Sequence, residues 1–311
     1  MAKMLLTAKD IGNRAAWLIM RQTGIGGSDA AAIVGLSRWK SQFSLWQEKR
    51  GEVDPPDISD NECVYWGHVL EQVVADRFCE LTGKKVRKTG LWADDEYNYL
   101  LASPDRLLVG ENAGLECKTA NGFTAKEWDG DEVPDAYYVQ CQHYMSVMRA
   151  DRWYIAVLIG GQKFVWKTIE RNDDDIAALR AAEIGFWRKV TSGEMPPVDG
   201  TQSCTDALNA RFAASRPDEI KLGADSEKIV RQIMQSEESK KQLETAIAAD
   251  KNLLREKLGE YEVGRAGDFK ITWRASKPRV SFDAKTFKEK MPEVYQKFTK
   301  ISAPIRTLRI S

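Results

Sequence analysis

The sequence lacks the residues on which several common kinds of site depend. Its five cysteines are scattered, and no two form a Cys-x-x-Cys pair, so neither a zinc ribbon nor an iron–sulfur cluster is expected. The only two histidines, His68 and His143, give little support for a His-based zinc site or a Ser-His-Asp triad. No run of about 18 apolar residues occurs, so we expect no membrane partner. The N-terminus resembles no secretory signal, which together with the scattered thiols predicts a cytoplasmic protein.

The charge of the chain is balanced overall but unevenly distributed. The sequence has 46 basic and 46 acidic residues. Residues 264–311 contain 12 basic and four acidic residues, a local charge of +8, so residues 1–263 carry −8. This asymmetry predicts a basic module joined to a more acidic body. The aromatic residues between the cations suit a groove that binds a nucleic-acid backbone; packing on the acidic body and docking of a protein partner are the alternatives.

Periodicity and turn residues predict two domains, residues 1–200 and 201–311, with the boundary near Pro196-Pro197. The second domain is expected to contain a charged helix over 225–258, ~50 Å long, and a short strand over 269–274. In the first domain we expect a helix that begins at Asp29 with Ser28 as its cap. The remaining predicted elements are helices at 41–50, 64–82, 137–148 and 173–191, strands between 85 and 118, and a hairpin of 153–159 with 163–170.

The most informative stretch is Ser103-Pro104-Asp105, followed after ten residues by Glu116-Cys117-Lys118. Strand periodicity places Glu116 and Lys118 on one face and Cys117 on the other. If the strands around Asp105 and Glu116 pair as a hairpin, two carboxylates and one ammonium group converge. Mg²⁺ prefers such oxygens, and a lysine beside them can orient or deprotonate a water, so the pattern predicts metal-assisted attack on a phosphodiester. The alternative is a turn aspartate beside an ordinary surface ion pair.

Two upstream features extend this prediction. Glu71 lies on the same helical stripe as Val74 and Phe78, where an unpaired carboxylate would be costly, so a metal or a lysine is expected near it. A Glu71 side chain that reaches solvent is the alternative. Arg21, a glycine loop and Ser28 follow one another before the predicted helix, an arrangement that suits a phosphate; a Gly-rich turn without function is the alternative here.

Five blocks in this order resemble a known family, the YqaJ-type viral recombinases. These are relatives of phage lambda exonuclease within the PD-(D/E)xK nuclease superfamily. The resemblance covers about residues 17–190. The blocks are RQTGIGGSDAAAIVG, YWGHVLEQVVADRF, SPDR, LECK and AYYVQCQHYM before WYIAV.

The resemblance implies a role for each matching position. Asp105 and Glu116 would coordinate Mg²⁺, two ions being expected and Mn²⁺ being able to substitute, with help from the backbone carbonyl of Cys117. Lys118 would act on the nucleophilic water. Glu71 would support the metals or that water.

Three further positions match the end-binding and orienting residues of the family. Arg21 and Ser28 would hold the terminal 5′-phosphate, and Gln140 would orient the site. Two departures stand out. Arg106 follows the aspartate where lambda-like members often have glycine, and the region after about Gly200 has no counterpart in the minimal exonuclease.

The resemblance also implies a fold, an activity and partners. The fold would be an α/β nuclease core, a mixed central sheet flanked by helices, with a long C-terminal helix and a small basic α+β extension. The activity would be Mg²⁺-dependent 5′-to-3′ digestion of linear double-stranded DNA, leaving 3′ single strands for an annealing protein. The oligomer would be a ring-shaped homotrimer. An endonucleolytic relative and a catalytically inert DNA-binding recombination factor are the alternatives.

Overall fold

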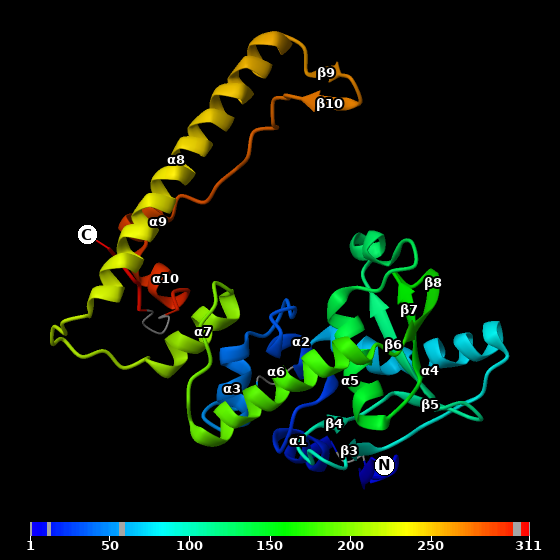
Figure 1. The fold of residues 1–311 in the computed structure, drawn as a ribbon. Coiled ribbons are helices and arrows are strands. Elements are labelled where there is room, and N and C mark those ends of the chain that lie inside the picture. Colours follow the sequence, from blue (N-terminus) through cyan, green and yellow to red (C-terminus); the bar gives the residue numbers. More distant parts are fainter. Residues whose placement is uncertain (1, 11–13, 56–59, 301–305, 311) are drawn as a thin grey trace. The chain divides into compact units, whose positions relative to one another are not determined.

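The computed structural model describes residues 2–10, 14–55, 60–300 and 306–310. The chain divides into two compact units, Met1–Arg211 and Phe212–Ser311, which are described separately (Figure 1).

A mixed five-stranded sheet forms the centre of the first unit. Its strand order is β2-β5-β6-β7-β8, with β6 and β7 parallel and the other neighbours antiparallel. The strands are β2 (Val86–Arg87), β5 (Arg106–Leu108), β6 (Ala113–Ala120), β7 (Arg152–Ile159) and β8 (Lys163–Glu170). The mixed α/β fold expected from the sequence is therefore confirmed, including the β7–β8 hairpin.

Helices cover both faces of this sheet (Figure 1). Helix α4 (Glu62–Thr82) packs on one face with a small apolar cluster. Helices α5 (Asp135–Met148) and α6 (Asp173–Ser192) belong to the larger core on the other face. Side chains that alternate along β7 enter the two cores in turn, because successive residues of a strand point to opposite faces. Trp153 packs on the α5 side and Tyr154 on the α4 side.

Helix α4 begins and ends as its sequence predicts, but its buried face is narrower than expected. Asn61 caps its start, and Gly83 ends it in the left-handed region at φ 68°. Val74 and Phe78 are buried, as the predicted stripe requires. Trp66 and Leu81, at the two ends of that stripe, are each 50% exposed, so only the middle of the helix is buried against the sheet.

The N-terminal part of this unit adds a small antiparallel sheet and short helices. The sheet has the order β1-β3-β4, formed by β1 (Lys3–Leu6), β3 (Leu91–Ala93) and β4 (Leu101–Ala102). The helices of this part are α1 (Arg14–Gln22), α2 (Gly27–Ile33) and α3 (Gln42–Lys49). Later in the unit, the 3₁₀ helix η2 (Gly122–Trp128) follows β6, and α7 (Gln202–Arg211) is its last element.

The predicted cap of α2 is wrong. Helix α2 begins one residue before Ser28, which lies inside its first turn, and Gly26 is the N-cap. The carboxylate of Asp29 accepts a hydrogen bond from the Gly26 amide at 3.0 Å, so an aspartate inside the helix satisfies the backbone donor that precedes it.

His143 belongs to the core, and it forms an ion pair between α5 and α6. Its Nδ1 lies 2.6 Å from Glu183 Oε1, and its Nε2 lies 2.8 Å from the Leu101 carbonyl oxygen. Burial would lower the pKa of His143, but Glu183 outweighs it and raises the pKa. Both partners offer acceptor oxygens, so the arrangement suits a ring that donates from both nitrogens.

The second unit contains one long helix and small elements that follow it. These are α8 (Ala224–Leu258), the antiparallel hairpin of β9 (Val263–Ala266) and β10 (Phe269–Thr272), α9 (Ala284–Lys290) and α10 (Pro292–Lys297). Figure 1 shows the hairpin at the far end of α8 and the chain returning alongside this helix to α9. Among the helices of the described residues, none has both the length and the apolarity needed to cross a bilayer.

Candidate active site

Asp105 lies at the edge of strand β6, where β5 stops pairing with it. The two strands pair antiparallel through Arg106–Leu115 and Leu107–Gly114. Beyond this pair the Cys117 amide donates to Asp105 Oδ2 at 2.7 Å. In a strand, the amide and carbonyl of one residue leave from the same edge, so the Cys117 carbonyl also faces the side of Asp105. The hairpin expected from the sequence forms and places Asp105 beside Glu116-Cys117-Lys118.

Glu116 is 4% exposed, and its two carboxylate oxygens differ in their hydrogen bonding. Its Oε1 accepts hydrogen bonds from Lys118 Nζ at 2.6 Å and from Gln140 Nε2 at 2.7 Å. Its Oε2 is buried, and no group of the described residues donates to it. A buried carboxylate oxygen without a donor is costly, so this atom is a candidate ligand for a bound cation.

Negative charge is concentrated around Asp105. Burial raises the pKa of Asp105 well above its usual range, and the carboxylates of Glu116 and Glu71 raise it further. Like charges at close range disfavour ionisation of each other. A divalent cation among these groups would remove that repulsion.

Lys118 is enclosed by the groups that orient it. Its Nζ donates to Glu116 Oε1, lies 3.2 Å from Gln140 Oε1 and stands 4.9 Å from the centre of the Tyr137 ring. Burial would lower the pKa of Lys118, but Glu116 and Asp105 outweigh it and raise the pKa. In this state Lys118 is therefore an ammonium donor.

Glu71 approaches the site from α4, and its partner is Arg106. The Arg106 guanidinium, 4% exposed, donates to Glu71 Oε1, to Gln72 Oε1 at 3.0 Å and to the Asp105 carbonyl at 2.6 Å. The Glu71 side chain is 28% exposed, and the cost of its carboxylate is offset by this arginine rather than by the metal or lysine expected from the sequence. Glu71 remains close enough to Asp105 to affect its charge.

The donor set suits Mg²⁺. Asp105, Glu116 Oε2 and the Cys117 carbonyl offer only hard oxygen atoms. No cluster of three or more His, Cys, Asp and Glu side chains within the described residues forms a complete metal site. Mg²⁺ does not require one, because it binds through one or two carboxylates and fills the remaining positions with water and substrate phosphate.

Arg21 and Ser28 lie together beside a buried ion pair. Arg21 Nη2 donates to Ser28 Oγ and lies 3.4 Å from Asp29 Oδ1. Lys49 Nζ lies 2.7 Å from Asp29 Oδ2 and donates to the Arg21 carbonyl at 2.9 Å. The side chains of Lys49 and Asp29 are 5% and 3% exposed. Burial would raise the pKa of Asp29, but Lys49 and Arg21 outweigh it and lower the pKa.

A series of side-chain contacts joins Arg21 to the carboxylates of the candidate metal site. The Arg21 guanidinium stands 5.2 Å from the Trp17 ring centre, and Trp17 Nε1 donates to Ser103 Oγ at 3.4 Å. The Tyr144 hydroxyl lies 3.3 Å from the Ser103 carbonyl oxygen and 3.1 Å from Gln140 Nε2. Gln140 in turn contacts Glu116.

Comparisons with known proteins identify the family of the chain. The family model of the YqaJ-like viral recombinase domain matches residues 16–151. The protein YqaJ of Bacillus subtilis (strain 168) is 41% identical over 295 residues, which cover 93% of this chain and 91% of that protein. The chain belongs to the YqaJ family. Protein D345L of African swine fever virus (strain Badajoz 1971 Vero-adapted) is 29% identical over 119 residues, 37% of this chain and 31% of that protein.

A solved structure shows that this family shares its fold with an alkaline exonuclease. The alkaline exonuclease LHK-Exo of Laribacter hongkongensis superposes with a TM-score of 0.50 at 18% identity, over 64% of this YqaJ-family chain and 98% of the exonuclease. A second structure of LHK-Exo, in complex with dAMP, gives the same TM-score at 19% identity and the same coverage.

Sequence reasoning did not identify Lys49, Trp17 and Tyr144 as partners of the site. Tyr144 could have been found from its spacing, because it lies one helical turn after Gln140. Lys49 lies on α3 and contacts Asp29, and Trp17 lies on α1 and contacts Ser103. Nothing in the local sequence of either helix indicates these tertiary contacts.

We expect Lys49→Met to destabilise the first unit strongly. Removing one partner of a buried ion pair leaves the other charge buried, at a cost of about 3–5 kcal/mol. Urea unfolding followed by tryptophan fluorescence should show a large decrease of the midpoint, and Asp29→Asn should restore part of it in the double variant.

Lys163→Met provides the matched control. Lys163 pairs with Asp129 at 3.1 Å, both side chains are more than half exposed, and such a pair contributes about 1 kcal/mol or less. Equal losses for the two variants would show that Lys49 is no more than a surface charge partner.

Proposed function

We propose that this chain is a Mg²⁺-dependent exonuclease that digests linear double-stranded DNA from 5′ to 3′ and leaves 3′ single strands. The buried Glu116 Oε2, to which no described group donates, is the observation that supports hydrolysis most directly, because a second carboxylate at Asp105 and an oriented lysine belong to the same site. Membership of the recombinase family and the exonuclease-like fold support the same reading.

Each residue of the centre has a task in this proposal. Asp105, Glu116 and the Cys117 carbonyl would hold the metal, which supplies charge neutralisation at the scissile phosphate and a more acidic water. Lys118 orients the attacking water, and Gln140 fixes Lys118 and Glu116 relative to each other through its amide. Glu71 assists from α4, with its position set by Arg106.

In this proposal, the preference for DNA ends comes from Arg21 and Ser28. Arg21 is about one third exposed, so its guanidinium can bind a phosphate, and Ser28 adds a hydroxyl donor. The contacts from Arg21 through Trp17, Ser103 and Tyr144 set the separation between a bound terminal phosphate and the carboxylates. Stepwise removal of terminal nucleotides requires that the terminal phosphate is held at a fixed distance from the groups that cleave the DNA.

The remaining partners belong to the proposal as well. Two Mg²⁺ ions would bind, with Mn²⁺ able to replace them, and three copies would form a ring around the duplex. The 3′ single strand would pass to an annealing recombinase in the cytoplasm of a bacterial host.

The deciding experiment uses duplexes labelled at one end, together with closed circular DNA, in Mg²⁺ and in EDTA. We expect mononucleotide release from the 5′ ends of linear DNA in Mg²⁺ only, with circular DNA intact. Cleavage of circular DNA would instead identify an endonuclease. Absence of metal-dependent cleavage on every substrate would identify an inert DNA-binding factor.

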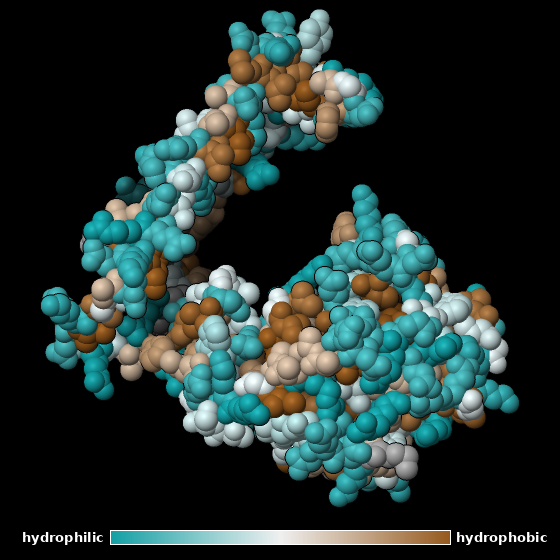
Figure 2. Space-filling view, viewed as in Figure 1, coloured by the Kyte–Doolittle hydropathy of each residue, from teal (hydrophilic) through white to brown (hydrophobic). Residues whose placement is uncertain are grey.

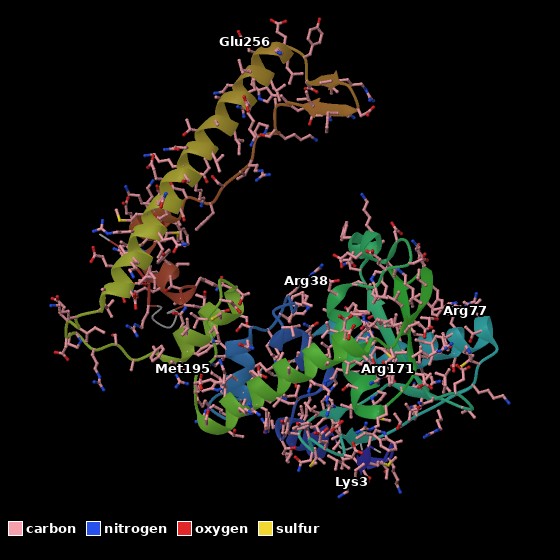
Figure 3. The ribbon with its side chains drawn as sticks, viewed as in Figure 1. Lys3, Arg38, Arg77, Arg171, Met195 and Glu256 are labelled. Carbon is pink, nitrogen blue, oxygen red and sulfur yellow. The ribbon has the colours of Figure 1, made fainter. Side chains whose placement is uncertain are left out.

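Arg21→Ala is expected to reduce the preference for phosphorylated ends. A guanidinium favours a phosphate dianion over a hydroxyl, so digestion of 5′-phosphorylated duplex should slow markedly while that of 5′-hydroxyl duplex changes little. The ratio of the two initial rates measures the effect. Arg77→Ala, on the exposed surface of α4 (Figure 3), is the control and should leave the ratio unchanged. Equal slowing of both substrates would contradict a role in end recognition.

A further inference from the structure

Helix α8 carries a row of side chains at coiled-coil spacing, which we call the α8 seam. Its positions alternate by four and three residues, as in a helix that packs along another helix. They are Ile229, Ile233, Ser236, Lys240, Leu243, Ile247, Asp250 and Leu254. Leu243 is 65% exposed and Ile247 is 51% exposed. Figure 2 shows hydrophobic patches along this helix between hydrophilic ones. The exposed aliphatic residues would be buried if a second helix packed on the seam.

A groove of about 600 Å³ lies along the middle of the α8 seam. Four seam residues contribute to its lining, namely Ser236, Lys240, Leu243 and Ile247. In a coiled coil, the side chains of a facing helix insert into such spaces between the side chains of the first helix. The groove therefore suits a helix that lies along α8.

Two charged residues interrupt the seam, and they indicate which helix can pack on it. Lys240 and Asp250 are both exposed and lie on either side of Leu243 and Ile247. If two copies of α8 pair antiparallel about a twofold axis level with residue 245, Leu243 packs on Ile247 of the second copy. Lys240 then lies opposite Asp250 of the second copy. A parallel pair in register would place like charges against each other at both positions, which is strongly unfavourable. The seam therefore favours the antiparallel pair.

The residues beside the seam are compatible with this register. On one flank, Glu237 lies opposite Lys251 of the second copy, so that two further ion pairs can form. Glu244 lies near Glu244 of the second copy, and Lys240 on its own helix, 3.9 Å away, reduces this repulsion. On the other flank, Ala246 lies beside Ala246 of the second copy, where a small side chain does not hold the helices apart.

We propose that α8 binds α8 of a second copy of this chain as an antiparallel pair, with Lys240 and Asp250 fixing the register. Polar residues in a coiled-coil seam specify register and orientation at some cost in stability. Residues 233–257 would form the contact, over roughly 36 Å of helix. The contact joins copies in twos, so it is additional to the ring of three copies proposed above. It does not require the chain to be a nuclease.

The orientation of the pair is tested by cross-linking the full chain through single cysteines with a short bismaleimide. Cys63 is an exposed thiol, so the parent variant is Cys63→Ser. In the antiparallel pair the two copies of residue 246 lie about 3 Å apart along the helix axis, and those of residue 236 about 27 Å apart. Relative to the parent, we expect Ala246→Cys to give a linked dimer and Ser236→Cys to give none. Linking of Ser236→Cys, as in a parallel pair, or no linking of Ala246→Cys would overturn the proposal.

Exchanging the two charges tests the register. Lys240→Glu places a carboxylate opposite Asp250 of the second copy, and Asp250→Lys places two ammonium groups together. Each should raise the protein concentration at which half of the Ala246→Cys chain is linked by about tenfold or more. The double variant Lys240→Glu/Asp250→Lys has opposite charges again and should return this concentration to the original value. A double variant that links no better than the single variants would overturn the proposal.

Lys241→Glu is the matched control for the charge exchange. Lys241 has the same acidic neighbours one turn away along α8 as Lys240, which are Glu237 and Glu244, but it lies off the seam. It should therefore leave the half-linking concentration unchanged. A loss of linking equal to that of Lys240→Glu would show that the helix, and not the seam, responds to the added negative charge, and would overturn the assigned register.

Discussion

Asp105→Asn is expected to abolish cleavage of linear duplex DNA and to leave the folded protein at least as stable as wild type. The asparagine can still accept the hydrogen bond from the Cys117 amide. It cannot supply the carboxylate charge that a divalent cation requires. Activity at saturating Mg²⁺ should therefore fall by orders of magnitude in a correctly folded variant.

The direction in which this substitution changes the stability follows from the pKa of Asp105. The folded-state pKa of Asp105 is raised by burial, Glu116 and Glu71, so ionised Asp105 opposes folding. Its contribution to stability is lost as the pH rises from the usual aspartate range through the raised pKa. In EDTA, Asp105→Asn should remove this loss, and its thermal midpoint at neutral pH should equal or exceed that of wild type.

Asp129→Asn is the matched control for this experiment. Asp129 is 61% exposed and pairs with Lys163 at 3.1 Å on the surface. This variant should retain both activity and wild-type pH dependence. Undiminished cleavage by folded Asp105→Asn would contradict the assignment of Asp105 as a metal ligand.

The sequence predicted the arrangement of the centre wherever it depended on local spacing. Glu116 and Lys118 share a strand face because they are two residues apart, and Asp105 meets them because a short hairpin joins β5 to β6. Gln140 was placed near them only through the family resemblance, since the packing of α5 on the sheet is a tertiary contact.

The predictions were less accurate for charged side chains whose partners come from distant parts of the sequence. An inward-facing Glu71 required a cation, but only the fold shows that Arg106 supplies it. The cap of α2 was assigned to Ser28 by residue type, whereas the helix begins at Gly27 and its Asp29 pairs with Lys49. In both cases the charged partner comes from an element distant in sequence, Arg106 from β5 and Lys49 from α3, which local spacing does not reveal.

Lys118→Arg should reduce the cleavage rate by orders of magnitude while DNA binding in EDTA persists. The ammonium of Lys118 fits between Glu116, Gln140 and the ring of Tyr137. A guanidinium is larger and planar, so it would displace Gln140 and would not present its donors where the compact ammonium orients the attacking water.

Lys163→Arg makes the same substitution in the exposed pair with Asp129 and should cleave at the wild-type rate. Single-turnover cleavage and anisotropy measured on both variants separate chemistry from binding. Near-wild-type cleavage by Lys118→Arg would mean that Lys118 acts only as a positive charge beside Glu116. Loss of binding together with cleavage would mean that Lys118 holds the DNA backbone. Retained binding with lost cleavage is the outcome expected of a group that acts on the attacking water, because such a group contributes more in the transition state than in the bound complex.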